Sequence, residues 1–264
     1  MTTETSELQS ITVERTGPVV TITLRRPEKK NAADGHMWNE LLHEFRTIPG
    51  DASIRAVVIT GAGGNFCSGA DLWAEGEGER PHQLSAMRHI TDVCLALHRI
   101  PQPTIAKVRG VAVGAGLNLA LSCDLIVAGE DARFSEIFAK RGLSLDFGGS
   151  WLLPRLVGMH RAKELALLAE IIDAPYAAEI GLVNRVLPDG ELDAFVDDWA
   201  ARLAGGPPIA LAMSKRMLNN SFNVTMEEAL EDEGLSQTVN FGTKDTAEAI
   251  TAFMQKRDPQ FQGR

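Results

Sequence analysis

The chain has 264 residues and a mass of 28.6 kDa, a length that fits one large α/β domain or two small domains. Hydrophobic residues make up 44% of the chain and charged residues 23%, which is enough apolar material for a substantial core. The net charge of −9 and the pI near 5.2 argue against binding to nucleic acid or to an anionic membrane, although a few local cations can still hold a small anionic ligand.

The first half of the chain alternates between strand and helix patterns. A hairpin is predicted over 9–15 and 18–25, because apolar residues alternate in "VVTITL" and a Gly-Pro pair marks the turn. The further elements are a helix from residue 37 to 48, a strand over 54–60, a helix over 82–98, a strand over 104–110, and a turn, a helix and a strand over 111–129. This alternation predicts βαβ units and a mostly parallel sheet. The acidic, glycine-bearing stretch 74–83 between two of them is predicted to be a mobile surface loop.

After residue 134 the pattern is helical, apart from one short strand at "VNRVLP". Helices are predicted over 159–170, 173–183, 190–203, 208–218, 226–241 and 244–256. In the second of these, Pro175 suits the first turn and Gly181 the C-terminal cap. We therefore expect one α/β core, residues 1–190, with a helical C-terminal region, residues 191–264.

Short sequence patterns argue against a disulfide framework, a signal peptide, a transmembrane helix and a metal site. Cys67, Cys94 and Cys123 form no CxxC pair, which indicates reduced thiols and a cytoplasmic setting. The opening "MTTETSELQS" has no apolar core of a signal peptide, and no run of eighteen apolar residues predicts a transmembrane helix. The six histidines lack HxH or HExxH spacing, so no metal site is expected.

Two glycine-rich turns each follow a predicted strand. They are "GNFCSGAD", residues 64–71, and "VGAGLNLAL", residues 113–121, which also opens a helix. Backbone N–H groups in such turns and at helix N-termini point outward without partners, so two adjacent turns can form an oxyanion hole. The alternative is that the glycines only permit tight turns. The full GxGxxG pattern is absent from the second turn, which disfavours a dinucleotide site.

Over almost its whole length the sequence resembles the enoyl-CoA hydratase/isomerase (crotonase) family. The resemblance is carried by six motifs in the family's order: "RRPEKKNA" (25–32), "GNFCSGADL" (64–72), "GVAVGAGLNLALSCDLIVAGEDARF" (110–134), "GGSWLLPRLVG" (148–158), "EIGLVNRVLP" (179–188) and "AFMQKRDPQFQGR" (252–264). It implies an α/β fold of repeated ββα units with a C-terminal helical trimerisation region, which forms homotrimers or dimers of trimers. It also implies binding of acyl-CoA thioesters and stabilisation of a thioester enolate. Coenzyme A is then part of the substrate, and no separate cofactor is expected.

The resemblance places the oxyanion-hole N–H groups on Ser68 and Ala115, with the helix that begins near Ala115 adding partial positive charge. The Ser68 hydroxyl is then incidental, and a serine nucleophile is disfavoured because GxSxG is absent. The segment Gly69, Ala70, Asp71 and Leu72 corresponds to residues that contact coenzyme A with backbone groups. For Asp71 the alternative is a carboxylate that caps the turn.

Other predicted contacts with coenzyme A come from the two ends of the chain. Lys30 and Asn31 lie in a loop that flanks coenzyme A in family members. Phe253 and Lys256 match a C-terminal element that reaches the coenzyme A of the same or a neighbouring subunit. Lys256 would then meet a ribose phosphate, and the alternative is a solvated charge on a helix.

Hydratases of this family use two glutamates to activate water, and both positions differ here. The first is occupied by Asn118, which can orient a water molecule or a substrate but cannot transfer protons. The second, aligned without gaps, is Phe138, which we expect to line an acyl pocket. Glu136 lies two residues earlier and could serve only if the loop shifts.

Asp146, just before Gly148-Gly149, matches the position of a single acid–base carboxylate in family members that move double bonds. Its apolar neighbours would desolvate it and raise its pKa. The alternative is an N-cap of the following helix. The leading hypothesis is an acyl-CoA isomerase. A hydratase that uses Glu136 or Asp146 and a non-catalytic acyl-CoA-binding protein are the alternatives.

Overall fold

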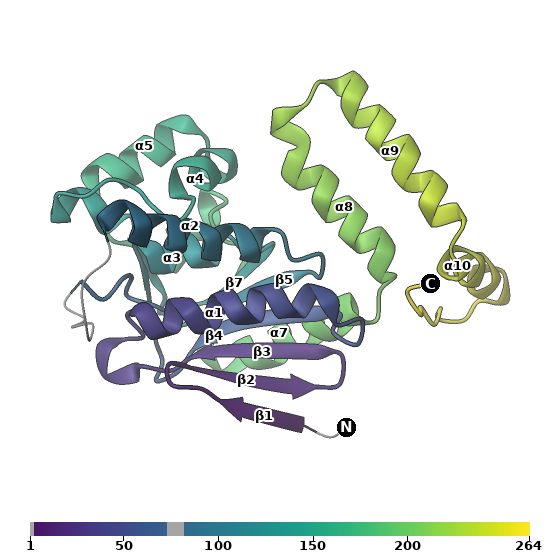
Figure 1. Cartoon of the computed structure of the whole chain (residues 1–264), viewed down its shortest axis with the longest axis horizontal. Helices are drawn as coiled ribbons and strands as arrows, with labels where there is room; N and C mark the ends of the chain where they lie inside the picture. Colours follow the sequence, from purple (N-terminus) through teal and green to yellow (C-terminus); the bar gives the residue numbers. More distant parts are fainter. Residues whose placement is uncertain (1–2, 73–81) are drawn as a thin grey trace.

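The computed structural model describes residues 3–72 and 82–264, so the predicted loop at 74–83 lies almost entirely outside the described residues. The strands are β1 (Thr3–Glu7), β2 (Ile11–Thr16), β3 (Val19–Leu24), β4 (Ala56–Gly61), β5 (Thr104–Val108), β6 (Val111–Val113), β7 (Leu125–Gly129), β8 (Arg133–Ser135), β9 (Ile172–Asp173) and β10 (Arg185–Leu187). The α-helices are α1 (Gly35–Thr47), α2 (Gln83–His98), α3 (Ala115–Leu121), α4 (Gly149–Val157), α5 (Met159–Leu168), α6 (Ala174–Glu179), α7 (Asp189–Ala204), α8 (Pro208–Asn220), α9 (Met226–Phe241) and α10 (Lys244–Gln255). Figure 1 shows a body of sheet and helices, with α8, α9 and α10 extending to one side.

The main sheet has seven strands in the order β1-β2-β3-β4-β5-β7-β10. The first three are antiparallel, and the pairs from β3 to β10 are parallel. The predicted hairpin and mostly parallel sheet are therefore confirmed. Strand β1 was not predicted from the sequence, because its residues "TETSE" are all exposed and show no apolar alternation.

A second sheet, β6-β8-β9, lies beside the two glycine-rich turns. Its strands have two or three residues each, and β8 pairs with β9 from nearly forty positions later in the chain. The prediction that only one strand follows residue 134 is therefore wrong. Such short strands exist because a distant partner supplies their hydrogen bonds, and no local pattern encodes that partner.

The centre of the main sheet is buried on both faces, as the continuous apolar run in β4 requires. Val57 and Ile59 of β4 pack into the larger core, which includes α1, α2 and α3. Val58 faces the other way and packs with Leu192 and Val196 of α7. Because α7 covers the sheet, the boundary expected at residue 191 falls inside a helix of the core, and the helical extension begins only after α7.

Helices α8, α9 and α10 form an arm that touches the body at a few polar contacts. Lys215 of α8 bonds Asp124 at 2.7 Å, and Arg55 donates to the carbonyl oxygen of Phe261 at 2.8 Å. The arm carries many exposed apolar side chains, including Phe241 (74% exposed) and Phe253 (85%). Within the described ranges, no helix is both long enough and apolar enough to cross a membrane.

Candidate active site

The two glycine-rich turns meet at backbone contact. Cys67 and Ala112 form a β-bridge, and the N–H of Val113 donates to the carbonyl oxygen of Cys67 at 3.0 Å. A Cβ atom on Gly116 would lie 2.3 Å from the same carbonyl oxygen, so only glycine permits this approach. The predicted pairing of the turns is therefore confirmed.

A cavity of about 610 Å³ opens over these turns. Its lining among the described residues is Lys29, Ala32, Ser68, Gly69, Ala70, Asp71, Leu72, Val113, Gly114, Ala115, Ile137, Phe138, Arg141, Leu143 and Asp146. Seven of these were not predicted as contacts, because the loops that carry them approach only in the folded chain. Another cavity, of about 570 Å³ between α2 and α8, has no carboxylate among its described lining residues and includes neither turn.

The two predicted oxyanion donors differ in availability. Ala115 is the first residue of α3, and its N–H has no acceptor among the residues that the structure describes. The N–H of Ser68 donates to the carbonyl oxygen of Lys30 at 3.0 Å. Of the two predicted donors, only Ala115 therefore has a free N–H among the described residues. A thioester oxygen must either share the N–H of Ser68 with the carbonyl oxygen of Lys30 or displace that oxygen.

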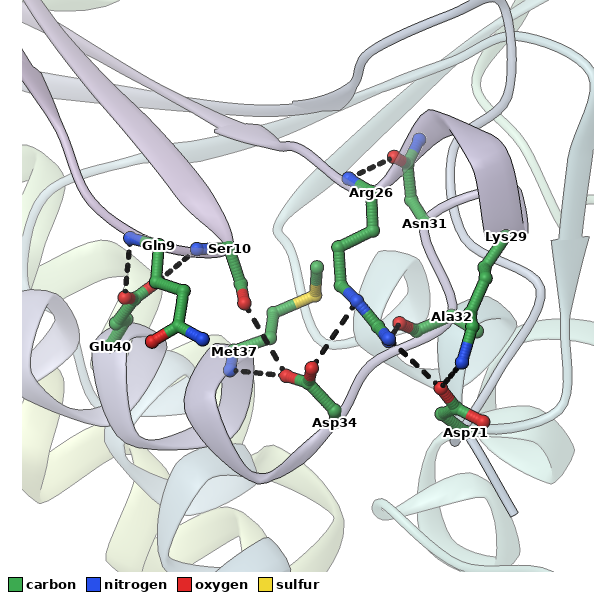
Figure 2. Close-up of polar contacts among 10 residues, drawn as sticks. All are labelled: Gln9, Ser10, Arg26, Lys29, Asn31, Ala32, Asp34, Met37, Glu40 and Asp71. Carbon is green, nitrogen blue, oxygen red and sulfur yellow. Dashed lines mark hydrogen bonds and ion pairs between the residues drawn. The ribbon is translucent and has the colours of Figure 1, made fainter. Parts of the chain in front are cut away.

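Asp71 ties the second motif to the "RRPEKKNA" loop, as Figure 2 shows. Its carboxylate accepts from Arg26 at 3.0 Å and from Lys29 at 2.8 Å, and its side chain is only 5% exposed. Arg26 also pairs with Asp34, whose carboxylate caps α1 through the N–H of Met37. The acidic side chain therefore fixes the loop beside the cavity, and Lys29 brings a cation to the cavity wall.

Asn31 and Lys30 position this loop through local geometry. Asn31 has a φ of 55° and is fully buried, and its amide accepts from the N–H of Arg26 and donates to the carbonyl oxygens of Ala62 and Asn65. The Asn31 side chain is therefore engaged in holding this loop, and the predicted contact of Asn31 with coenzyme A stays a prediction. Lys30 does not line the cavity within the described chain, and its neighbour Lys29 does.

Asp146 lines the cavity from the loop that precedes α4. Its Oδ1 is buried and has no hydrogen-bond partner within residues 3–72 and 82–264, and burial raises its pKa to about 6. The N-cap of α4 is Gly148, without a side-chain cap. The helix-cap alternative is therefore wrong, and the carboxylate faces the cavity uncommitted.

The residue after Asp146 helps to fix this loop. Phe147 has a φ of 45°, which is strained for a residue with a side chain, and it is only 3% exposed. Its ring packs against Trp38 of α1 with centroids 5.3 Å apart. Burial of the ring thus offsets the backbone strain. It also fixes the backbone next to Asp146, and with it the orientation of the Asp146 side chain.

Of the two positions that the resemblance matches to the glutamates of family hydratases, Phe138 lines the cavity and Asn118 does not, among the described residues. Phe138 is 6% exposed and lines the cavity, as expected. Asn118 is fully buried, and its amide donates to Glu136 and to the main-chain oxygen of Asp146. The amide hydrogens of Asn118 are therefore used within the protein, and Asn118 is not among the described residues that line the cavity, so its predicted contact with the substrate is not supported.

Phe253 and Lys256 lie at the end of α10 and do not line the cavity within the described chain. Phe253 is 85% exposed, and Lys256 adopts a left-handed C-cap conformation with a φ of 53°. The structure therefore does not bring these two side chains to the cavity of their own subunit. Their predicted contact with coenzyme A, of the same or a neighbouring subunit, stays a prediction.

The chain is similar to known proteins over nearly its whole length. The family model "Enoyl-CoA hydratase/isomerase" matches residues 14–264. The chain is 36% identical over 250 residues to a 1,2-epoxyphenylacetyl-CoA isomerase of Escherichia coli (93% of this chain, 95% of the relative). It is 33% identical over 255 residues to a short-chain-enoyl-CoA hydratase of Clostridium acetobutylicum (95% of this chain, 97% of the relative).

Solved structures give the same result. An enoyl-CoA hydratase from Bacillus anthracis superposes with a TM-score of 0.92 at 33% identity, covering 97% of this chain and 100% of that one. The fold of this chain is thus shared with that structure over nearly its whole length. The chain belongs to the enoyl-CoA hydratase/isomerase family and has its crotonase fold.

Proposed function

We propose that the protein is an acyl-CoA double-bond isomerase in which Asp146 is the single acid–base residue. The main support for this proposal is that Asp146 lines the cavity with a buried carboxylate oxygen that has no partner in the described part of the chain. Asp71 also lines the cavity, but its carboxylate is held by Arg26 and Lys29. Among the described lining residues, Asp146 is the carboxylate with an unpartnered oxygen.

The chemistry needs one proton carrier and one stabilised oxygen. Asp146 removes a proton from the carbon next to the double bond, and the electron pair moves through the conjugated system to the thioester oxygen, forming a dienolate. The N–H of Ala115, joined by that of Ser68, binds the developing negative charge. Asp146 then returns the proton to the other end of the system, which leaves the double bond shifted and the composition unchanged.

The raised pKa of Asp146 suits this role. A base with a pKa of about 6 is ionised at neutral pH, and its conjugate acid is still strong enough to return the proton. Ionisation must come before the first step, so turnover should rise as pH increases through about 6.

A hydratase is the second candidate, because relatives carry both names. Hydration needs a group that activates water as well as a group that protonates carbon. Glu136 is the further carboxyl group that the sequence offers for this role, but it is fully buried and does not line the cavity within the described chain. This disfavours a two-carboxylate hydration. A non-catalytic acyl-CoA-binding protein is disfavoured because Asp146 lies uncommitted in the cavity.

The test is to incubate the protein separately with 3-enoyl-CoA and 2-enoyl-CoA and to identify the products by mass spectrometry. We expect an isomeric product of unchanged mass from the 3-enoyl substrate. A product heavier by one water molecule would establish the hydratase instead. Tight binding without any product would establish the non-catalytic protein.

We also propose that the protein is a homotrimer or a dimer of trimers whose C-terminal helices cross subunit boundaries. An apolar stripe on α9 and α10 consists of Phe241, Ala247, Ile250 and Phe253, of which Phe241, Ile250 and Phe253 are exposed by 74%, 55% and 85%. Light scattering at micromolar concentration should give three or six times the mass of the chain. A single monomeric species would contradict this assembly.

A further inference from the structure

Three polar residues are linked by hydrogen bonds beside the cavity. Asn118 lies on α3, Glu136 immediately precedes the 3₁₀ turn Ile137–Arg141, and Asp146 lies before α4. Asn118 and Glu136 are both fully buried, whereas Asp146 lines the cavity. The fold thus places an amide and a carboxyl group behind the carboxylate that faces the ligand.

The amide of Asn118 connects the other two residues. Its Nδ2 donates to Oε2 of Glu136 at 3.3 Å and to the main-chain oxygen of Asp146 at 3.0 Å, which uses both of its hydrogens. A Cβ atom on Gly149 would lie 2.5 Å from Nδ2. Glycine at this position therefore lets the amide reach the loop that carries Asp146.

The cluster contains more acceptors than donors. Oδ1 of Asn118, Oε1 of Glu136 and Oδ1 of Asp146 are buried and lack hydrogen-bond partners in the described part of the chain. A proton on Glu136 would add one donor where acceptors are in excess, and a neutral carboxyl group is far less costly to bury than a carboxylate.

The surrounding charges favour the same protonation state. Burial raises the pKa of Glu136 to about 8; the hydrogen bond from Asn118 acts in the opposite direction, and the negative charge of Asp146 adds to the rise. Cys94 of α2 also faces Asp146, and burial raises the pKa of its thiol, so it stays neutral. Arg141 lines the cavity at the end of the 3₁₀ turn but makes no ion pair with Glu136.

On the basis of the proposed function, we propose that protonated Glu136 is a positioning residue. It fixes the amide of Asn118, which holds the main chain at Asp146 and so directs the catalytic carboxylate into the cavity. Glu136 does not touch the substrate in this arrangement. Its ionisation would place a second negative charge beside Asp146 and near the developing enolate, and would thereby slow the reaction.

The experiment compares two replacements of Glu136 across pH. Wild-type kcat/KM for 3-enoyl-CoA should rise through about pH 6 with Asp146 and fall through about pH 8 with Glu136. Glu136→Gln keeps a neutral side chain that can bond Asn118, so it should retain activity at pH 7 and lose the alkaline fall.

Glu136→Met has a similar length but cannot accept from Asn118. We expect kcat to fall by about 10- to 100-fold, because a small displacement of the base is costly, with unchanged affinity for a saturated acyl-CoA. Ser135→Ala is the matched control: it removes a neighbouring buried hydroxyl that bonds the carbonyl oxygen of Ala169 at 3.3 Å, so it should alter the melting temperature but not the pH profile.

Two results would overturn the positioning role: a normal kcat in Glu136→Met, or an alkaline fall that persists in Glu136→Gln. If Glu136→Met does not fold, the pH profile of Glu136→Gln still decides. Asp146→Asn, measured alongside, separates the two proposals. Normal turnover in that variant refutes the proposed function. If Asp146→Asn is inactive but Glu136→Met keeps a normal kcat, or Glu136→Gln keeps the alkaline fall, only the positioning role is refuted.

Discussion

Asp146→Asn is expected to lower the rate of double-bond isomerisation by about 10²–10⁴, while acyl-CoA still binds. Asparagine has nearly the size of aspartate but cannot accept a proton from carbon and return it. No second carboxylate is free to replace it, because the only other one among the described lining residues is held by Arg26 and Lys29. Turnover should be measured with 3-enoyl-CoA and binding with a saturated acyl-CoA.

The stability of the same variant distinguishes catalysis from a structural role. The folded state raises the pKa of Asp146 from 3.8 to about 6, so it binds this proton more tightly than the unfolded state. The contribution of Asp146 to the free energy of unfolding therefore falls as pH rises through that interval. At pH 7 the asparagine variant should melt at the wild-type temperature or above it. Near-normal isomerisation together with a lowered melting temperature would contradict our assignment.

Ala115→Pro is expected to reduce turnover by about 10²–10³, because it removes an oxyanion donor. Ala115 is the donor whose N–H is free, whereas that of Ser68 is engaged with Lys30. Proline is well tolerated at the first position of a helix, where no intrahelical bond is lost. The change therefore removes the N–H with little disturbance of α3.

Ala115→Gly is the matched control, since it also alters the side chain but keeps the N–H. It should retain most of the turnover, and circular dichroism should show that both variants are folded. Loss of activity confined to the proline variant supports the oxyanion assignment. Equal turnover in the folded proline variant would show that the thioester oxygen is bound elsewhere.

Much of the site was predictable because its main features are local in sequence. The glycine turns follow apolar strands, and parallel neighbouring strands bring such turns to one edge of the sheet. Asp146 was identifiable because a lone carboxylate among apolar residues must be desolvated once the chain folds. The elements with clear periodicity, such as β3 and α1, also formed close to their expected positions.

The tertiary structure alone decided what each polar side chain bonds. Asp71 meets Arg26 across 45 positions of the chain, and Asn31 bonds backbone atoms more than 30 positions away. Sequence spacing carries no record of such partners, so the bonds by which these two side chains hold the loop could not be predicted from the sequence.

Glu136 illustrates the same limit most directly. The sequence determined that a carboxyl group lies two positions before Phe138, and that Asn118 and Asp146 belong to motifs near the expected site. Only the packing of α3 against the loop before α4 brought the three together and buried Glu136 completely. Burial and hydrogen bonding, which depend on the whole fold, set its protonation state, because the surrounding protein and not the neighbouring residues replaces the water around it.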